Sequence, residues 1–311
     1  MYKKIIALSG LLFLMCTILI VGCGADVPSQ KKKKNEVKSS DFEEREYIKA
    51  KNFKIKKRMA TSYFYNNNGK LQERGTKVEE VTYYENGALH EVIRFTSTGQ
   101  IDLKWTYKYD LDGNILSLET INEYGMVFYK RESHYKNGYE TRRYEKDYGQ
   151  KYEVNISYEY DDRGNMIEET AKDMKGELFS RVEYEYKNDR IMKITSYNRD
   201  DKLTLIKENT YDEVGNRIRE ILTYPSTTID TVTYKYDERK NILEMDQGYF
   251  LQKYVFDERE NMLSQEWYSK GVDKQGTFKF IYDDRGLVVE RIRMDSLDEP
   301  VIYTRYEYEF Y

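Results

Sequence analysis

The chain has 311 residues, with 51 Lys or Arg against 55 Asp or Glu, 32 Tyr and 3 Pro. Disordered chains are poor in aromatic residues, so this composition excludes a largely disordered chain despite its many charges. Aromatic residues mixed with charged ones favour β-strands with one buried face and one face in water.

Charge is distributed unevenly along the chain. Residues 24–58 contain 12 Lys or Arg against 6 Asp or Glu, whereas residues 59–311 contain 37 against 49. An acidic domain repels phosphate, so nucleic acid is excluded as an expected partner. The basic segment can lie against an anionic membrane surface.

Residues 1–22 have the parts of a secretory signal peptide, with Lys3 and Lys4 followed by an apolar stretch. The alternative is an uncleaved anchor, for which the 17 apolar residues 5–21 are short. The stretch ends in Ile20-Val21-Gly22-Cys23, which resembles the lipobox of bacterial lipoproteins. The resemblance implies cleavage between Gly22 and Cys23, lipid on Cys23, and a lipid-anchored place on the outer side of a cell membrane or in an outer membrane. Without the leader, Cys23 is the only cysteine, so no internal disulfide is expected.

Residues 23–58 are expected to form a basic tether that contains Lys31-Lys32-Lys33-Lys34. A solvated, flexible linker is favoured over specific lipid recognition. Ser40-Asp41-Phe42-Glu43 fits a capping box, which allows a short helix over roughly 41–50.

Residues 59–311 contain a repeat of about 25 residues, whose unit is Tyr-Asp-x-x-Gly-Asn. The clearest copies begin at Tyr109, Tyr160, Tyr211, Tyr236 and Tyr282, and looser copies lie at Tyr65, Tyr84, Tyr135, Tyr186 and Phe256. Alternating apolar and polar residues precede each copy, as in Val154, Ile156 and Tyr158, and this period of two predicts half-buried strands.

Each copy predicts a β-hairpin, because Asp then two residues then Gly suits a type I turn followed by a bulge with a left-handed residue. The structural turn residues are expected to be Asp110, Gly113, Asp161, Gly164, Asp212, Gly215, Asp237, Asp257, Asp283 and Gly286. Lys240 and Glu260 replace the glycine in two copies, so those turns are expected to use Asn241 and Asn261 instead, or to be looser.

A second, variable turn between copies gives about 18–20 strands in one antiparallel meander. We expect an all-β domain of tandem hairpins that forms a long, curled, open, solenoid-like sheet. Glu307 and Glu309 in the last strand suit a guarded sheet edge.

The Tyr-Asp-x-x-Gly-Asn units resemble the YD repeats of Rhs-type proteins, and Tyr84-Glu85-Asn86-Gly87-Ala88-Leu89 is similar to units of MORN-like antitoxin-type proteins. The resemblance covers roughly residues 60–311 and implies a strip of hairpins. The cleavage motif and toxin segment expected of large Rhs toxins are not found in these 311 residues, so the resemblance predicts fold rather than activity.

No catalytic motif is present, and His90 and His134 are interpreted as surface residues rather than a metal pair. Asp110 to Asn114 lacks the spacing of an EF-hand loop. We therefore expect no metal and no cofactor. Trp105 and Trp267 are candidates for stacking on a ligand, with core packing as the favoured alternative.

The sequence favours a non-enzymatic, membrane-anchored, extracytoplasmic protein that binds or scaffolds an envelope protein or polysaccharide. One alternative is an immunity or antitoxin-like protein, whose acidic surface masks a basic toxin. A carboxylate-based glycosidase is the less favoured alternative.

Overall fold

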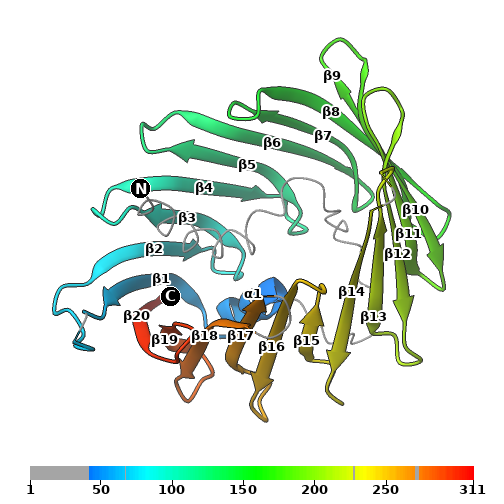
Figure 1. Cartoon of the computed structure of the whole chain (residues 1–311). Helices are drawn as coiled ribbons and strands as arrows, with labels where there is room; N and C mark the ends of the chain where they lie inside the picture. Colours follow the sequence, from blue (N-terminus) through cyan, green and yellow to red (C-terminus); the bar gives the residue numbers. More distant parts are fainter. Residues whose placement is uncertain (1–41, 67, 227, 270–272) are drawn as a thin grey trace, which may run out of the picture.

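The computed structural model describes residues 42–66, 68–226, 228–269 and 273–311. The signal peptide, Gly22, Cys23 and the lysine run of the tether lie outside these residues. The described chain contains one helix, α1 (Phe42–Asn52), where the capping-box pattern allows one, and then strands only (Figure 1).

Twenty strands follow one another in chain order. They are β1 (Ile55–Phe64), β2 (Thr76–Tyr83), β3 (Leu89–Phe95), β4 (Ile101–Tyr109), β5 (Ile115–Asn122), β6 (Val127–Lys136), β7 (Tyr139–Asp147), β8 (Tyr152–Tyr160), β9 (Met166–Asp173), β10 (Leu178–Lys187), β11 (Arg190–Tyr197), β12 (Leu203–Tyr211), β13 (Arg217–Thr223), β14 (Ile229–Tyr236), β15 (Ile242–Asp246), β16 (Phe250–Phe256), β17 (Met262–Ser269), β18 (Asp273–Tyr282), β19 (Val288–Met294) and β20 (Pro300–Phe310). Each strand pairs antiparallel with the next, as the repeated hairpins predict.

The sheet closes into a barrel, so the expected open strip is wrong. β1 pairs with β20 over nine residue pairs, from Ile55 opposite Phe310 to Phe64 opposite Ile302. No strand among the described residues is left with a free edge, because β1 also pairs with β2 and β20 with β19. Glu307 and Glu309 therefore guard no edge. They lie opposite Met59 and Lys57 of β1, on the outer face of a paired strand.

The two ends of the barrel carry different turns. Nine hairpins, from β2–β3 to β18–β19, lie at one end, which we call the YD rim because it contains the Tyr-Asp turns. The hairpins from β1–β2 to β19–β20 lie at the opposite rim. Tyr65 belongs to the β1–β2 hairpin and so lies at the opposite rim, away from the other copies. In the copy at residues 83–88, Tyr84 occupies the Asp position, and Tyr83 is the buried anchor.

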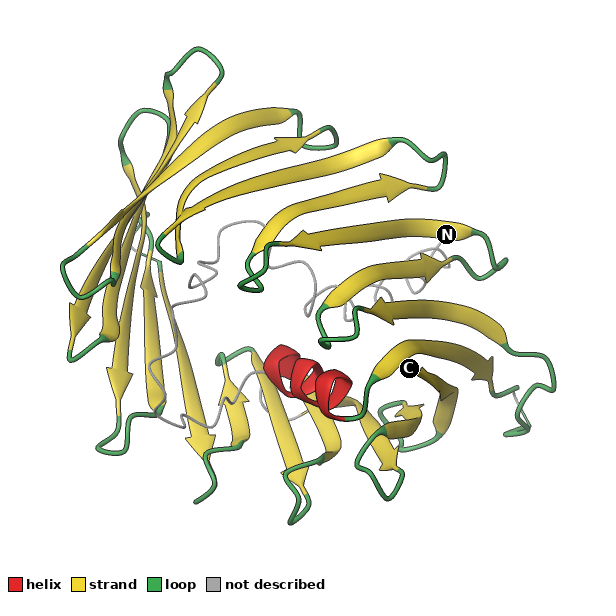
Figure 2. Cartoon of the chain, turned by 180° about the vertical axis from the view of Figure 1, so that it is seen from behind, coloured by secondary structure: helices red, strands yellow, loops and turns green. Residues whose placement is uncertain are grey.

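Helix α1 lies inside the ring of strands at the YD rim (Figures 1 and 2). Ala50 packs in a buried cluster with Val81, Tyr83 and Val92, and Trp105 and Tyr107 pack against that cluster. The expected boundary at residue 59 therefore differs from the structure, where α1 and β1 already belong to the barrel. These contacts also identify the inner face of the sheet.

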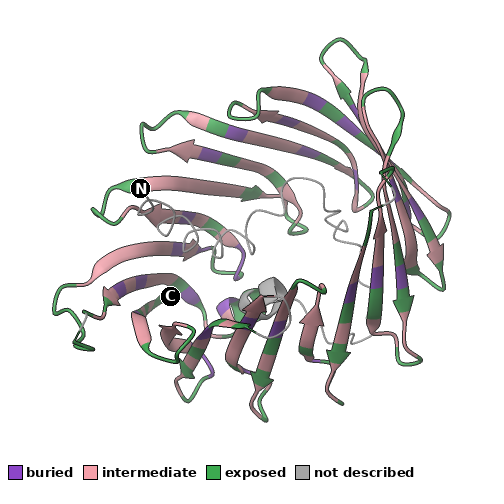
Figure 3. Cartoon of the chain, viewed as in Figure 1, coloured by how far each residue is buried: buried purple, intermediate pink, exposed green. Residues whose placement is uncertain are grey.

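The residue pairs between neighbouring strands show which residues share the inner face around the barrel. Tyr107 on β4 lies opposite Leu118, which lies opposite Arg131, then Glu145 and Val154 on β8. A second buried cluster forms on this inner face at β8–β11, around Val154, Ile156, Tyr158, Met166 and Tyr184. Buried positions lie along the strands and exposed ones concentrate in the hairpins (Figure 3).

Candidate functional site

The turn residues expected from the sequence form one structural unit, repeated along the YD rim. In the β8–β9 hairpin the amide of Gly164 donates to the Asp161 carbonyl at 2.9 Å, and the amide of Asp161 donates to the Asn165 carbonyl at 2.8 Å. One carboxylate oxygen of Asp161 accepts the amides of Arg163 and Asn165, and the other accepts the Asn165 side chain. Gly164 has a φ of 85°, the left-handed conformation that suits glycine.

The same unit occurs at Asp110, Asp212, Asp237 and Asp257, and at Asp283 with Leu287 in place of the asparagine. Gly113, Gly215 and Gly286 likewise have positive φ. Hydrogen bonds from the Asn165 side chain and amide lower the pKa of Asp161. These carboxylates are occupied by their own turns, so they serve the fold.

Lys240 and Glu260 adopt the left-handed conformation themselves, with φ of 69° and 65°. Their turns keep the same hydrogen bonds as the glycine copies. The expectation that Asn241 and Asn261 would take over the left-handed position is therefore wrong. The hairpins at Tyr135 and Tyr186 differ, because Asn137-Gly138 and Asn188-Asp189 all have positive φ, as in two-residue type I′ turns.

The repeated tyrosine has a second role, which the sequence did not reveal. Its hydroxyl donates to a main-chain carbonyl at the start of the preceding strand, over 2.7 to 2.9 Å. The pairs are Tyr160 to Glu140, Tyr211 to Ile191, Tyr236 to Arg217, Tyr282 to Met262 and Tyr308 to Val288. Each bond joins one hairpin to the next, just below the YD rim.

The two tryptophans lie on the inner face. Trp267 is only 6% exposed and packs against Phe278, with ring centroids 4.9 Å apart and ring planes tilted by 38°. Trp105 packs against the α1 cluster, beneath Arg94. Trp267 therefore offers no free ring face to a ligand. The two histidines are exposed, as expected, and His90 lies against Tyr84.

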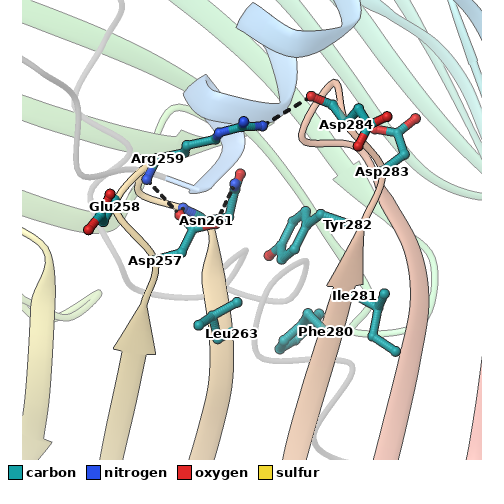
Figure 4. A pocket seen from close by; sticks show the side chains of 10 residues that line it. All are labelled: Asp257, Glu258, Arg259, Asn261, Leu263, Phe280, Ile281, Tyr282, Asp283 and Asp284. Carbon is teal, nitrogen blue, oxygen red and sulfur yellow. Dashed lines mark hydrogen bonds between the residues drawn. The ribbon is translucent and has the colours of Figure 1, made fainter.

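A hollow of about 560 Å³ lies at the YD rim between the β16–β17 and β18–β19 turns (Figure 4). It is lined by Asp257, Glu258, Arg259, Asn261, Leu263, Phe280, Ile281, Tyr282, Asp283 and Asp284. Arg259 bridges the two turns by donating to the Asp284 carbonyl at 3.1 Å. Lys49 of α1 lies over the Tyr282 ring and 3.5 Å from the Asn261 side-chain oxygen. The hollow thus lies where the two turns meet, and Lys49 of the helix contacts two of its lining residues.

The inner face of β6–β9 holds a cluster of charged side chains. Glu140 is 2% exposed and accepts two hydrogen bonds from Arg143, at 2.7 and 3.0 Å. Arg131 lies 3.5 Å from the same carboxylate, and Glu145 lies 3.3 Å from Arg143. Burial acts to raise the pKa of Glu140, but the hydrogen bonds and charge of Arg143 outweigh it, so that pKa is lowered. The charges in this cluster therefore compensate one another.

Glu169 on β9 lies directly opposite Tyr158 in the same cluster. Burial raises the pKa of Glu169, and the charge of Arg143 only partly opposes that shift. The Tyr158 hydroxyl is buried without a hydrogen-bond partner in the structure. Among Glu140 and Glu169, folding therefore lowers the pKa of the first and raises the pKa of the second.

The rim opposite the YD rim carries large apolar side chains at the tips of its hairpins. Seven of them are more than half exposed, and we call these seven the apolar crown: Tyr124, Met126, Tyr148, Met174, Ile229, Tyr249 and Leu297. They come from six hairpins spread around the barrel. On the YD rim, the turn tips are mostly Asp, Glu, Asn and Arg, with Leu111 and Val214 as exposed apolar exceptions.

The crown was missed from the sequence because the turns that contain it are not alike. An alignment anchored on the Tyr-Asp units leaves the variable turns unaligned, although an apolar residue recurs in most of them. Placing those turns on a common rim requires the barrel topology, after which the apolar residues form one ring.

Neither a group of metal-binding side chains nor a membrane-spanning helix is present among the described residues. Within those ranges no three His, Cys, Asp or Glu side chains are grouped as they would be to hold a metal ion. In the same part of the chain no helix has the length and apolar character needed to cross a membrane.

No family model and no curated protein matches this chain. Among solved structures, a Photorhabdus luminescens Tc holotoxin pore is similar at 11% identity and a TM-score of 0.29, over 76% of this chain and 19% of that one. A TcdB2-TccC3 structure is similar at 12% identity and a TM-score of 0.33, over 77% of this chain and 16% of that one. A porin-like protein from Bacteroides uniformis is similar at 11% identity and a TM-score of 0.38, over 83% of this chain and 97% of that one.

The chain spans less than a fifth of the length of either toxin chain. Identities and TM-scores at this level establish neither a shared fold nor a shared activity. The likeness of the Tyr-Asp units to YD repeats therefore stays a resemblance.

Proposed function

We propose that this chain is an extracytoplasmic, lipid-anchored protein that acts by binding rather than by catalysis, and that its binding surface is the apolar crown. The crown is the observation that carries this proposal. Exposed apolar side chains on a ring of hairpin tips serve no purpose in the packing of the barrel. Because the hairpins that carry them lie at one end of the barrel, these side chains can contact a common partner.

The walls of the barrel support the crown as the binding surface. On the inner face, aromatic rings pack against one another and the charged groups pair among themselves. On the outer face, charged side chains form ion pairs in water, as Lys130 with Glu132, Lys193 with Glu185 and Arg305 with Glu307. A Lys or Arg facing lipid would cost about 2–4 kcal/mol at the middle of a bilayer. The outer wall therefore suits water.

The location rests on the leader, whose Ile20-Val21-Gly22-Cys23 resembles a lipobox. Cys23→Ser should abolish lipid labelling, and the protein should stay unprocessed or be released from the membrane. Normal processing and anchoring of the Cys23→Ser protein would refute the lipid anchor.

The binding surface is tested by placing a photo-crosslinking amino acid at single positions in intact cells. Positions 124 and 249 report on the crown, and positions 163 and 239 are matched exposed positions on the YD rim. We expect adducts from the crown positions only. Equal yields from both rims, or adducts from the YD rim alone, would contradict the crown as the binding surface.

A further inference from the structure

We propose that the apolar crown docks on an electrically neutral lipid surface. The proposal rests on the proposed function, which places lipid near the barrel, and it names the partner of the same rim. In a closed antiparallel barrel the hairpins that follow the odd-numbered strands all lie at one end. The tips that carry Tyr124, Tyr249 and Leu297, which are 75%, 64% and 80% exposed, therefore lie at the same end of the barrel.

The spacing of the crown favours lipid over a protein partner. Neighbouring hairpins of one rim lie about two strand spacings apart, roughly 10 Å. Polar residues such as Asn122, Asp147 and Asp173 separate the apolar tips. A protein interface has a continuous apolar core, which separated side chains do not supply. A bilayer is fluid and accepts aromatic and aliphatic side chains one by one at the headgroup level.

The charge of this rim indicates which lipid it accepts. The β19–β20 hairpin carries Asp295, Asp298 and Glu299, and Glu123 adjoins Tyr124. Lys274 pairs with Asp298, and the repeat domain as a whole is acidic. Anionic headgroups would be repelled at low ionic strength, and a second copy of the same acidic rim would be repelled as well.

The anchor can bring the crown to the same bilayer. Residues 24–41 separate Cys23 from α1, and 18 residues span at most about 60 Å when extended. A nine-residue strand such as β4 is about 30 Å long. The tether is thus long enough for either rim of the barrel to face the membrane.

The test is flotation with vesicles of phosphatidylcholine, and with vesicles in which phosphatidylglycerol replaces part of it. The protein is the chain from residue 23 onward with Cys23→Ser and with Lys31, Lys32, Lys33 and Lys34 changed to Ser. The apolar leader and the lipid would insert by themselves, and the lysine run would bind anionic vesicles independently of the crown. The crown variant is Tyr124→Ser with Tyr249→Ser and Leu297→Ser. The matched control is Leu111→Ser with Val214→Ser, which removes exposed apolar tips from the other rim. Circular dichroism and the thermal midpoint show that both variants stay folded.

We expect the unchanged protein and the control to bind phosphatidylcholine vesicles, and the crown variant to bind about tenfold more weakly or worse. Phosphatidylglycerol should weaken binding at low salt, and added salt should restore it. Equal binding by the crown variant, or no binding of the unchanged protein to neutral vesicles, overturns the proposal. A crown-dependent dimer in sedimentation without vesicle binding overturns it in favour of a second copy. Lipid labelling of Cys23 is a separate readout, so failure of the anchor and failure of the crown are distinguishable.

Discussion

The side-chain hydroxyl of Tyr311 donates a hydrogen bond to the main-chain carbonyl of Tyr83. Tyr311 follows β20 and Tyr83 ends β2, so this bond passes across the start of β1. The amide of Tyr311 also donates to the Lys54 carbonyl, at 2.9 Å. The Tyr236 and Tyr282 hydroxyls bind the adjacent strand, whereas the Tyr311 hydroxyl reaches past β1 to β2. Tyr311 thus adds a link of its own at the seam, the junction where β1 pairs with β20.

The tyrosine links should each contribute to stability. Tyr236→Phe removes the hydroxyl that donates to the Arg217 carbonyl and leaves the ring in place. We expect the free energy of unfolding to fall by about 1 kcal/mol, since the part-buried hydrogen bond to the Arg217 carbonyl is lost. Tyr249→Phe is the control, because Tyr249 is an exposed tip residue. Chemical denaturation measures both, and an equal effect would show that the link adds nothing.

The YD turns should respond to substitution according to their φ angles. Gly164→Val puts a β-branched side chain at a φ of 85°, and a Cβ there would clash with the Tyr139 hydroxyl oxygen. We expect a loss of about 2–3 kcal/mol. Lys240→Gly relieves a left-handed lysine and should stabilise by up to about 1 kcal/mol. Thermal midpoints that move in the same direction for both variants would contradict the turn geometry.

The charged cluster of the inner face should show two opposite pH dependences. The pKa of Glu140 is lowered by folding, so its stabilisation is present above the ordinary value of 4.5 and is lost as the pH falls. Glu140→Gln should cost about 3 kcal/mol at pH 7, because it removes the carboxylate that accepts two hydrogen bonds from Arg143, and less in acid.

Glu169 has the opposite sign, because its pKa is raised by folding. Its contribution is present below the ordinary value of 4.5 and is lost as the pH rises through the folded value. Glu169→Gln should therefore raise the thermal midpoint at pH 7 and change it little in acid. Midpoints of the two glutamine variants that keep a constant difference across the pH range would disprove this assignment.

Removal of β20 tests how far the closed wall acts as one unit. Deleting residues 300–311 leaves β1 and β19 each with an unpaired edge. We expect the truncated barrel to lose its fold cooperatively, seen as loss of the β signal in circular dichroism. An open strip would lose only its last unit, and a truncated chain that keeps most of its β signal would agree with that picture instead.

Much of the local structure could be predicted from the sequence. The alternation in Val154, Ile156 and Tyr158 identified a strand and its buried face, and the Asp-x-x-Gly spacing identified the hairpins. These features depend on residues close together in the chain. The same alternation placed Trp105 on the face of Tyr107. In the structure both side chains pack against the cluster around Ala50.

Closure could not be predicted in this way, because it pairs residues about 240 positions apart. β1, with Lys56, Lys57 and Arg58, contains no Tyr-Asp unit, and its charges placed its first residues, 55–58, in the expected tether. The glutamates of β20 are compatible with an unpaired edge strand, but they are equally compatible with the outer, solvent-facing side of a paired strand. The crown escaped notice for a related reason, since its residues become neighbours only on the rim of a closed barrel.

Closure is tested most directly by a crosslink across the seam. The Ser62 and Thr304 side-chain oxygens lie 2.9 Å apart, on residues directly opposite in β1 and β20. Cysteines at these two positions, in the chain from residue 23 with Cys23→Ser, are close enough for a disulfide. A control pair at Ser62 and Thr277 joins β1 to β18, which does not pair with it. The closed barrel predicts that the first pair oxidises fully in the folded protein, with no free thiol and a reduction-sensitive gel shift, while the control pair stays reduced. Free thiols at positions 62 and 304 in a folded protein would contradict the closed barrel.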